Sequence, residues 1–249
     1  MRIFNCGDKK RIGVVFFAGA LFVILNVILL PQTFAQQAGH SFYPNRLPIG
    51  VVGQGALLQP FSMQGYLQQV KFLLPEGTKI AFATNDKFLL PEAAPFQIGL
   101  FVGNVYRFQL TDIPYHAGKE LYPSVEVIDR LYPPAGKEME FPVEIEITQE
   151  DLEIAMNGRM VTRIIYLEDA FKAQPTTGEE RIALSEELKP EENALEAAKK
   201  FGRPMAILRI GNRQPDPNQS DSAFFFGSPT WIGKQNIEIQ AQSGQKIVR

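Results

Sequence analysis

Among the side chains of this sequence that could do chemistry, carboxylates are the most numerous at close spacing. Seven of them fall between positions 138 and 153, and clustered carboxylates can bind calcium or act as an acid/base pair. Glu144 and Glu146, however, alternate with apolar residues, as on a solvated strand face. Glu150 and Asp151 stand where a helix start favours negative charge. We therefore interpret the cluster as structural, and keep a hydrolase acting on glycans or peptides through Glu144 or Glu146 as an alternative.

A second run of oxygen-bearing side chains, Asp216, Asn218 and Ser220, has the alternate spacing with which a calcium loop opens. An EF-hand loop also needs glycine at its sixth position and glutamate at its twelfth, where this chain has Asp221 and Gly227. These departures remove the sharp turn and the bidentate ligand. We interpret the run as a polar turn, and expect neither a metal nor another cofactor.

His116 is one of two histidines, and Asp112 and Glu120 lie near it in sequence as partners for a base. No nucleophile motif such as G-x-S-x-G accompanies it. A lone histidine in a loop is usually exposed or locally hydrogen-bonded, so we expect no catalytic role and predict no catalytic residue.

Glycines recur in the segment Gly50-Val-Val-Gly53-Gln-Gly55. Such a loop cradles phosphate when it joins a strand to a helix. No helix is predicted after it and the lysine of a P-loop is absent, so we interpret the segment as flexible lead-in.

Aromatic side chains remain as binding candidates, above all in the run Phe224 to Phe226. Side chains alternate along a strand, so three successive phenylalanines cannot all point inward from one strand. Cover from within the chain is the interpretation we favour. The alternative is a platform for a sugar or a protein, and the candidate binding surface comprises Phe225, Trp231, Tyr115 and His116.

The elements that would position these residues are mainly strands. The runs 67–74 and 78–84 flank the turn Pro75-Glu76-Gly77 and predict a hairpin, as do the runs 96–102 and 104–111 around Gly103. Further strands are expected over 124–131, 141–147, 160–167, 204–210 and 237–239.

Two short helices interrupt the strands. Thr148 is a suitable N-cap for the first, which Asn157-Gly158 would close. The second is expected to start near Pro190 and end at Gly202. Many short strands separated by glycine and proline turns favour a β-sandwich.

The N-terminus has the pattern of a secretory signal peptide. A basic start leads into an apolar run over 12–30, and Thr33-Phe34-Ala35 offers a cleavage site. The run is also long enough to span a bilayer, so a retained membrane anchor is the alternative.

Composition limits the partners. The leader holds four of the 25 basic residues and one of the 27 acidic ones, which leaves a net charge of −5 on the 214 residues after position 35. An acidic chain without a basic patch argues against nucleic acid. Cys6 is the only cysteine, so the exported part contains none, which excludes thiol catalysis and cysteine-ligated metal sites there.

Four stretches carry a resemblance: 103–114, 120–127, 161–169 and 202–211. With them the chain resembles a group of uncharacterised exported bacterial proteins over about residues 65–212. The resemblance implies export and a β-rich body, and brings no known activity or site residues. The fold class we expect, by analogy at the level of the fold, is an immunoglobulin-like or prealbumin-like β-sandwich with two short helices.

The predicted organisation follows the chain. Residues 1–35 form the signal peptide, 36–65 an extended lead-in, 66–212 the sandwich body with a loop near 168–180, and 213–249 an aromatic turn region with a flexible tail. Two small β-rich units joined near 170–180 are the alternative. We expect an exported, non-enzymatic protein of the periplasm, cell surface or exterior. It would bind a protein or an envelope polysaccharide, and would meet the membrane only if residues 12–30 are retained, as a tethered structural component.

Overall fold

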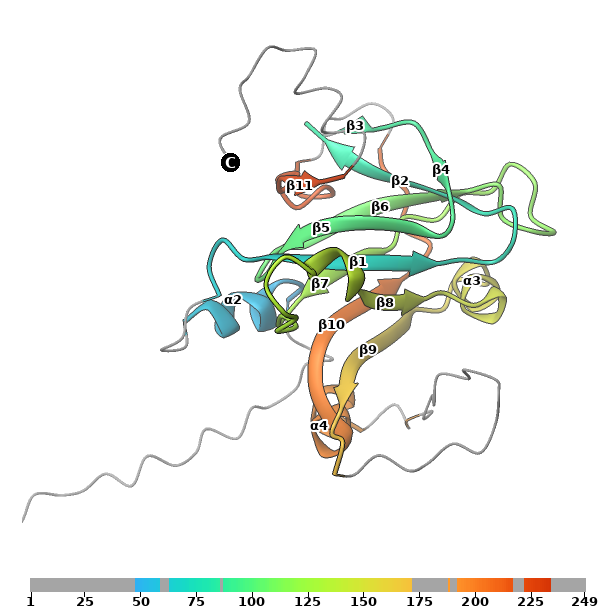
Figure 1. Cartoon of the computed structure of the whole chain (residues 1–249). Coiled ribbons are helices and arrows are strands. Elements are labelled where there is room, and N and C mark those ends of the chain that lie inside the picture. The colour runs from blue at the N-terminus through green and yellow to red at the C-terminus, as the bar shows by residue number, and fades with distance from the viewer. Residues whose placement is uncertain are drawn as a thin grey trace, which may run out of the picture. The chain divides into compact units, whose positions relative to one another are not determined.

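The computed structural model describes residues 48–58, 63–85, 87–171, 188, 192–216 and 222–233, all within one unit that runs from Tyr43 to Arg249 (Figure 1). The prediction of a mainly β body is confirmed. Its strands are β1 (Leu67–Leu73), β2 (Lys79–Thr84), β3 (Lys87–Phe88), β4 (Glu92–Ala93), β5 (Phe96–Phe101), β6 (Val105–Thr111), β7 (Ser124–Val127), β8 (Val143–Glu146), β9 (Val161–Glu168), β10 (Gly202–Ile210) and β11 (Trp231–Ile232). Its helices are α2 (Val51–Leu57), α3 (Gln149–Met156), α4 (Ala194–Phe201) and the 3-10 turn η1 (Glu138–Glu140).

The strands form two sheets with a shared core. One sheet has the order β11-β5-β1-β8, and the other the order β3-β2-β6-β7-β10-β9, with β4 also paired to β2. Phe72 of β1 meets Phe82 of β2 and Phe108 of β6 at ring-centroid distances of 5.6 and 5.1 Å. All three rings are buried, so aromatic packing joins the two sheets.

Both predicted hairpins are wrong in their pairing, although their strands are confirmed. β1 pairs with β5 and β8, whereas β2 pairs with β3, β4 and β6. The turn at Pro75–Gly77 therefore carries the chain from one sheet to the other, and Gly103 does the same between β5 and β6. Turn residues show where a chain reverses, but the strands on either side pair only if they remain in one sheet.

Helices α3 and α4 agree with their predicted bounds to different degrees. α3 has the expected N-cap: the Thr148 hydroxyl accepts from the Asp151 amide, and the Asp151 carboxylate accepts from the Thr148 amide. α4 begins later than predicted, at Ala194, directly after the N-cap Asn193, whose side chain accepts from two amides of the first turn. Pro190 therefore precedes the helix. Gly202, expected to end it, also starts β10.

The lead-in differs from the prediction of an extended segment, because residues 51–57 form helix α2. Buried Gly53 and Ala56 seat α2 against the body. No helix among the described residues is long and apolar enough to cross a membrane. The apolar run 12–30, the cleavage site after Ala35 and the predicted strand 237–239 lie outside the described residues.

Candidate interaction surface at the edge strand β9

Strand β9 is the outermost strand of the larger sheet. It pairs with β10 on one side, and no described strand pairs with its other side. β9 has eight residues, whereas the other terminal strands of the two sheets, β3, β8 and β11, have two, four and two. In Figure 1 β9 is the yellow arrow beside β10, with α4 against the lower part of both. A long unpaired edge presents a row of backbone donors and acceptors to another strand.

Both side-chain faces of β9 are held in place. On one face Arg163 donates from Nε and Nη2 to the buried Asp151 carboxylate of α3, at 2.9 and 2.8 Å. On the other face Ile164 packs against the cluster that contains Leu195 of α4, and Tyr166 lies against Phe201 with ring centroids 6.1 Å apart. The edge is therefore presented by a strand whose side chains are already anchored.

The hydrogen-bond pattern shows which backbone groups point outward. The Asp169 amide donates to the Phe201 carbonyl at 3.0 Å, in register with the β9–β10 pairing. Backbone groups alternate along an antiparallel strand, so those of Glu168 and Tyr166 point away from β10. The backbone amide and carbonyl of Glu168 thus lie on the outer edge of the sheet.

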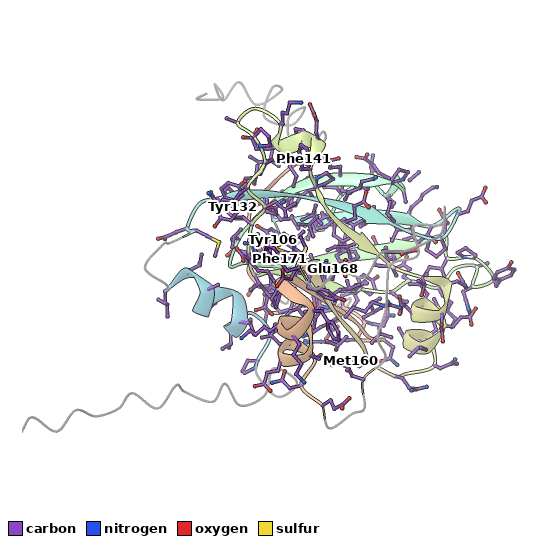
Figure 2. All side chains as sticks on the ribbon, turned by 60° about the horizontal axis from the view of Figure 1, so that its bottom comes forward. Tyr106, Tyr132, Phe141, Met160, Glu168 and Phe171 are labelled. Atoms are coloured by element: carbon purple, nitrogen blue, oxygen red, sulfur yellow. The ribbon has the colours of Figure 1, made fainter. Side chains whose placement is uncertain are left out.

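Apolar side chains gather at the two ends of β9. Met160 directly before the strand is 68% exposed, Leu167 near its end 46%, and Phe171 just after it 100%. Phe201 at the end of α4 is also exposed. Figure 2 labels Met160, Glu168 and Phe171 along this stretch. We call these four apolar residues and the outer edge of β9 the edge surface. It combines outward backbone groups such as those of Glu168 with exposed apolar side chains, and a partner strand requires both.

A shallow cavity of about 290 Å³ lies at the end of the edge surface, and its lining carries charges of both signs: Leu167, Glu168, Asp169, Lys199, Gly202 and Arg203. Arg203 is held by Asp129 at 2.7 Å and by the ring of Tyr132, whose centroid is 5.3 Å from its guanidinium carbon. Arg130 lies over Tyr132 from 4.3 Å. Both arginines thus contact the exposed Tyr132 ring. This arrangement is more typical of a fixed polar rim around the cavity than of an aromatic platform for a sugar.

The predicted aromatic platform is largely interior. Phe225 and Trp231 are 8% and 3% exposed, so these two members of the predicted surface offer no face to a ligand. The Trp231 indole donates to the Ala83 carbonyl at 2.7 Å, and Phe225 packs against Phe88. Phe224 to Phe226 lie in turns rather than in a strand, which is why two successive phenylalanines are buried. The cover comes from within the chain.

Tyr115 and His116 occupy a surface turn. Tyr115 is 93% exposed with a φ of 62°, and the His116 amide donates to the Ile113 carbonyl. The neighbouring carboxylates are engaged elsewhere: Asp112 pairs with Lys79, and Glu120 accepts from Tyr122 and Gln109. The structure therefore engages both predicted acid partners of His116 with other side chains.

The carboxylate candidates are dispersed. Glu144 and Glu146 are exposed on β8, and Glu144 pairs with Lys71 at 2.9 Å. The reading of β8 as a half-buried strand is confirmed by its alternating burial. Asp216 is exposed, while Asn218 and Ser220 lie outside the described residues. No group of three or more metal-binding side chains occurs in the described part of the chain.

The glycine-rich segment binds a carboxylate of the protein itself. Amides of Gly50 and Gly53, at the start of α2, donate to the Glu126 carboxylate at 3.1 and 2.7 Å. Arg209 donates to the same carboxylate at 2.9 Å, and Glu126 is 0% exposed. The expectation of a flexible segment without a helix is therefore wrong. The start of α2 is instead stabilised by an anion of the chain itself, the Glu126 carboxylate. This contact cannot be read from the sequence, because positions 50 and 126 lie far apart in it.

Three buried polar groups have displaced pKa values. Burial raises the pKa of Tyr106 to about 12, although its hydroxyl accepts from the Phe101 amide and donates to the Thr230 carbonyl. Burial and the Glu120 carboxylate raise the pKa of Tyr122 to about 12. Burial and the charge of Arg213 lower the pKa of Arg107 to about 10. Arg107 donates to the carbonyls of Phe224 and Tyr122, so these groups fix the aromatic turn.

Comparisons with protein-family models, with curated proteins and with solved structures find no match for this chain. The resemblance to exported bacterial proteins stays a prediction, and function is inferred below from the geometry alone. The edge surface was not predicted as a site. The run 160–167 did predict the strand β9, and the density of apolar residues in this run was the one available signal of the edge surface.

Proposed function

We propose that this chain is an exported, non-enzymatic binding module of the cell envelope whose partner adds a β-strand to the edge of β9. The observation that carries the proposal is the length of the open edge. Natural sheets usually shorten, charge or cover such edges, because an open one pairs with other chains. Here no described strand lies on the outer side of the eight-residue strand β9, and exposed apolar side chains lie next to it.

The anchoring of β9 by two helices supports a binding role for its edge over chance exposure of that edge. α3 holds Arg163 through Asp151, and α4 contacts the opposite face through Ile164 and Tyr166. A partner strand meeting this edge would not have to order β9, so little conformational entropy is lost on binding. Main-chain hydrogen bonds would supply affinity, and contacts at Leu167 and Phe201 would supply selectivity.

In-cell photo-cross-linking tests the proposal. A photoreactive phenylalanine analogue is placed at exposed Thr162 of β9 and, as a matched control, at exposed Glu144 of β8. We expect a discrete adduct from position 162 and none of that size from position 144. The same adduct from both positions, or none from position 162, would contradict the proposal.

A pair of substitutions at Glu168 separates backbone from side chain. Glu168→Pro removes an amide that points outward, so it costs no bond to β10 but deletes a donor for the partner. Glu168→Ala removes the exposed side chain and keeps the amide. We expect the adduct to be lost in Glu168→Pro and retained in Glu168→Ala, and equal adducts from both variants would refute strand addition.

Export and the finer fold class belong to the same proposal. Mass spectrometry of the chain recovered from its host would show an N-terminus at Gln36 if the leader is cleaved after Ala35. An intact leader would favour the membrane-tethered alternative. We further propose that the two-sheet arrangement is a variant of the immunoglobulin-like or prealbumin-like sandwich, which an experimental structure would test through its strand order.

A further inference from the structure

We infer that Arg130, whose guanidinium lies against two tyrosine rings, is a binding site for the carboxylate of an acidic polypeptide. The site lies on the loop between β7 and η1, so it goes beyond strand addition at β9 and does not depend on it. Three features carry the inference: the contacts that fix the guanidinium, the absence of a counterion among the described residues, and the surface around it.

Two aromatic rings fix the Arg130 guanidinium. Its central carbon lies 4.2 Å from the ring centroid of Tyr66 and 4.3 Å from that of Tyr132, which is labelled in Figure 2. Tyr66 directly precedes β1, and its hydroxyl donates to the Leu131 carbonyl at 3.4 Å, which keeps its ring beside the arginine. Contacts of this kind order the side chain before a ligand arrives, so less conformational entropy is lost on binding.

The charge of Arg130 has no counterion among the described residues. The adjacent acid, Asp129, uses both carboxylate oxygens elsewhere: Oδ1 accepts from the backbone amide of Arg130, and Oδ2 from Nη1 of Arg203, each at 2.7 Å. The buried nitrogens without a partner include Nε of Arg130 but neither of its terminal nitrogens. Since those terminal nitrogens donate to no described residue, they must reach the surface, where an acceptor can meet them.

The local charge suits a single carboxylate. Arg203 is balanced by Asp129, so Arg130 leaves one positive charge beside the Tyr132 ring. A guanidinium presents N–H groups in a fork that matches the two oxygens of a carboxylate. The whole chain has a net charge of −2, so it has no general attraction for anions, and binding of an anion would depend on this one place.

The surroundings favour a polypeptide over an acidic sugar. Arg130 and Arg203 lie 4.3 and 5.3 Å from the Tyr132 ring centroid, so arginine rather than a sugar already packs on this ring. Leu167 of β9 is the register partner of Arg203 on β10 and is 46% exposed. An acidic segment with apolar neighbours would therefore meet both a cation and an apolar side chain, as in interfaces between proteins.

Binding of poly-L-glutamate tests the site. Titration calorimetry at low salt compares the full chain with Arg130→Gln, which removes the charge, and with Arg159→Gln. The latter is the matched control, because Arg159 is exposed in the turn before β9, at the opposite end of that strand from Leu167. We expect Arg130→Gln to weaken binding at least about ten-fold, as for the loss of a charge-assisted hydrogen bond, and Arg159→Gln less than about two-fold.

Further variants keep the test independent of any loss of folding in Arg130→Gln. Arg130→Lys retains the charge but not the planar fork, and should weaken binding several-fold. Tyr132→Ala should also weaken binding, whereas Tyr132→Phe should not, because the ring rather than the hydroxyl contacts the guanidinium. Thermal unfolding midpoints show which variants remain folded. Unweakened binding in both Arg130→Lys and Tyr132→Ala would contradict a fixed guanidinium as the site.

Other outcomes would also overturn the inference. Equal affinity of Arg130→Gln and the unmodified chain, or no binding of poly-L-glutamate, would exclude the site. Polygalacturonate carries carboxylates on a polysaccharide; if it bound as tightly and lost its binding in Arg130→Gln, a polypeptide ligand would be refuted. Glu168→Pro and Glu168→Ala should bind poly-L-glutamate alike, so failure of strand addition at β9 would be distinguishable from failure of this site.

Discussion

Glu126 illustrates how a buried charge organises residues far apart in the sequence. Its carboxylate receives the amides of Gly50 and Gly53 and the guanidinium of Arg209, and it has no exposed surface. A charge in such a position is stable because hydrogen bonds replace its water. The cluster ties α2 to β7 and β10, so the segment preceding β1 is part of the folded body.

Replacing Glu126 by glutamine tests that interpretation. The amide leaves the buried Arg209 charge without a counterion, so Glu126→Gln should lower the free energy of unfolding by about 3–5 kcal/mol. The matched control is Glu144→Gln, which breaks a largely exposed ion pair with Lys71 and should cost less than about 1 kcal/mol. Urea unfolding measures both, and similar losses would mean that the cluster contributes no more than a surface pair.

Tyr106 leads to a prediction about alkaline stability. Its pKa and that of Tyr122 are about 12 in the folded chain, against about 10 when unfolded. Between these values the folded chain retains protons that the unfolded chain has released, so stability falls as pH rises. Each tyrosine contributes up to about 1.4 kcal/mol per pH unit. The lowered pKa of Arg107 acts in the opposite direction, because the unfolded chain then binds the extra proton. It offsets the loss of stability contributed by about one of the two tyrosines.

Urea midpoints measured across this alkaline range check the sign. Tyr106→Phe should make the pH-dependent loss of stability shallower, or reverse it, because the remaining tyrosine and Arg107 roughly cancel. Tyr115→Phe, at a fully accessible site, should leave the slope as it is in the unmodified chain. An unchanged slope in Tyr106→Phe would be inconsistent with a protonated buried phenol.

At the scale of elements, Gly103 shows how closely α2 is fitted to the sheets. Its φ is 87°, and a Cβ atom there would lie 2.4 Å from Cδ1 of Leu57 in α2. Gly118 also has a positive φ, of 72°, but its surroundings are open. Substitution at the two glycines therefore separates the effect of backbone strain from that of a collision with Leu57.

Alanine at each position gives a matched comparison. Gly118→Ala should cost about 1–2 kcal/mol from strain alone. Gly103→Ala adds overpacking against Leu57 and should cost about 1–3 kcal/mol more. Equal losses in thermal or urea unfolding would indicate that α2 moves away freely from β5 and β6.

Element types could be predicted from the sequence better than element partners. Alternating Val143 and Ile145 identified β8, and Thr148 with Asp151 identified the start of α3. The Pro75–Gly77 turn identified a reversal but not the change of sheet that follows it. Helix α2 was missed because its cap is Gly50, without a capping side chain, and its stabilising anion is 76 residues away.

At the scale of the whole molecule, the candidate site could not be predicted from sequence because it is defined by the position of β9 at the end of the larger sheet, with no described strand beyond it. The run from Met160 to Leu167 predicts a strand, but its pairing with β10 as the one described neighbour is a property of the assembled sheet. The aromatic run at Phe224 is a second case in which sequence does not name the neighbour. Its sequence favours cover from within the chain without identifying that cover, which Tyr122 and Phe88 provide in the fold.

Amide hydrogen exchange along β9 tests the central claim most directly. The cross-linked adduct recovered from the host is compared with the dilute, unlinked chain. The outward amide of Glu168 should exchange rapidly in the dilute chain and slowly in the adduct, while amides of β8 keep one rate in both. Unchanged exchange at Glu168 would contradict strand addition at this edge.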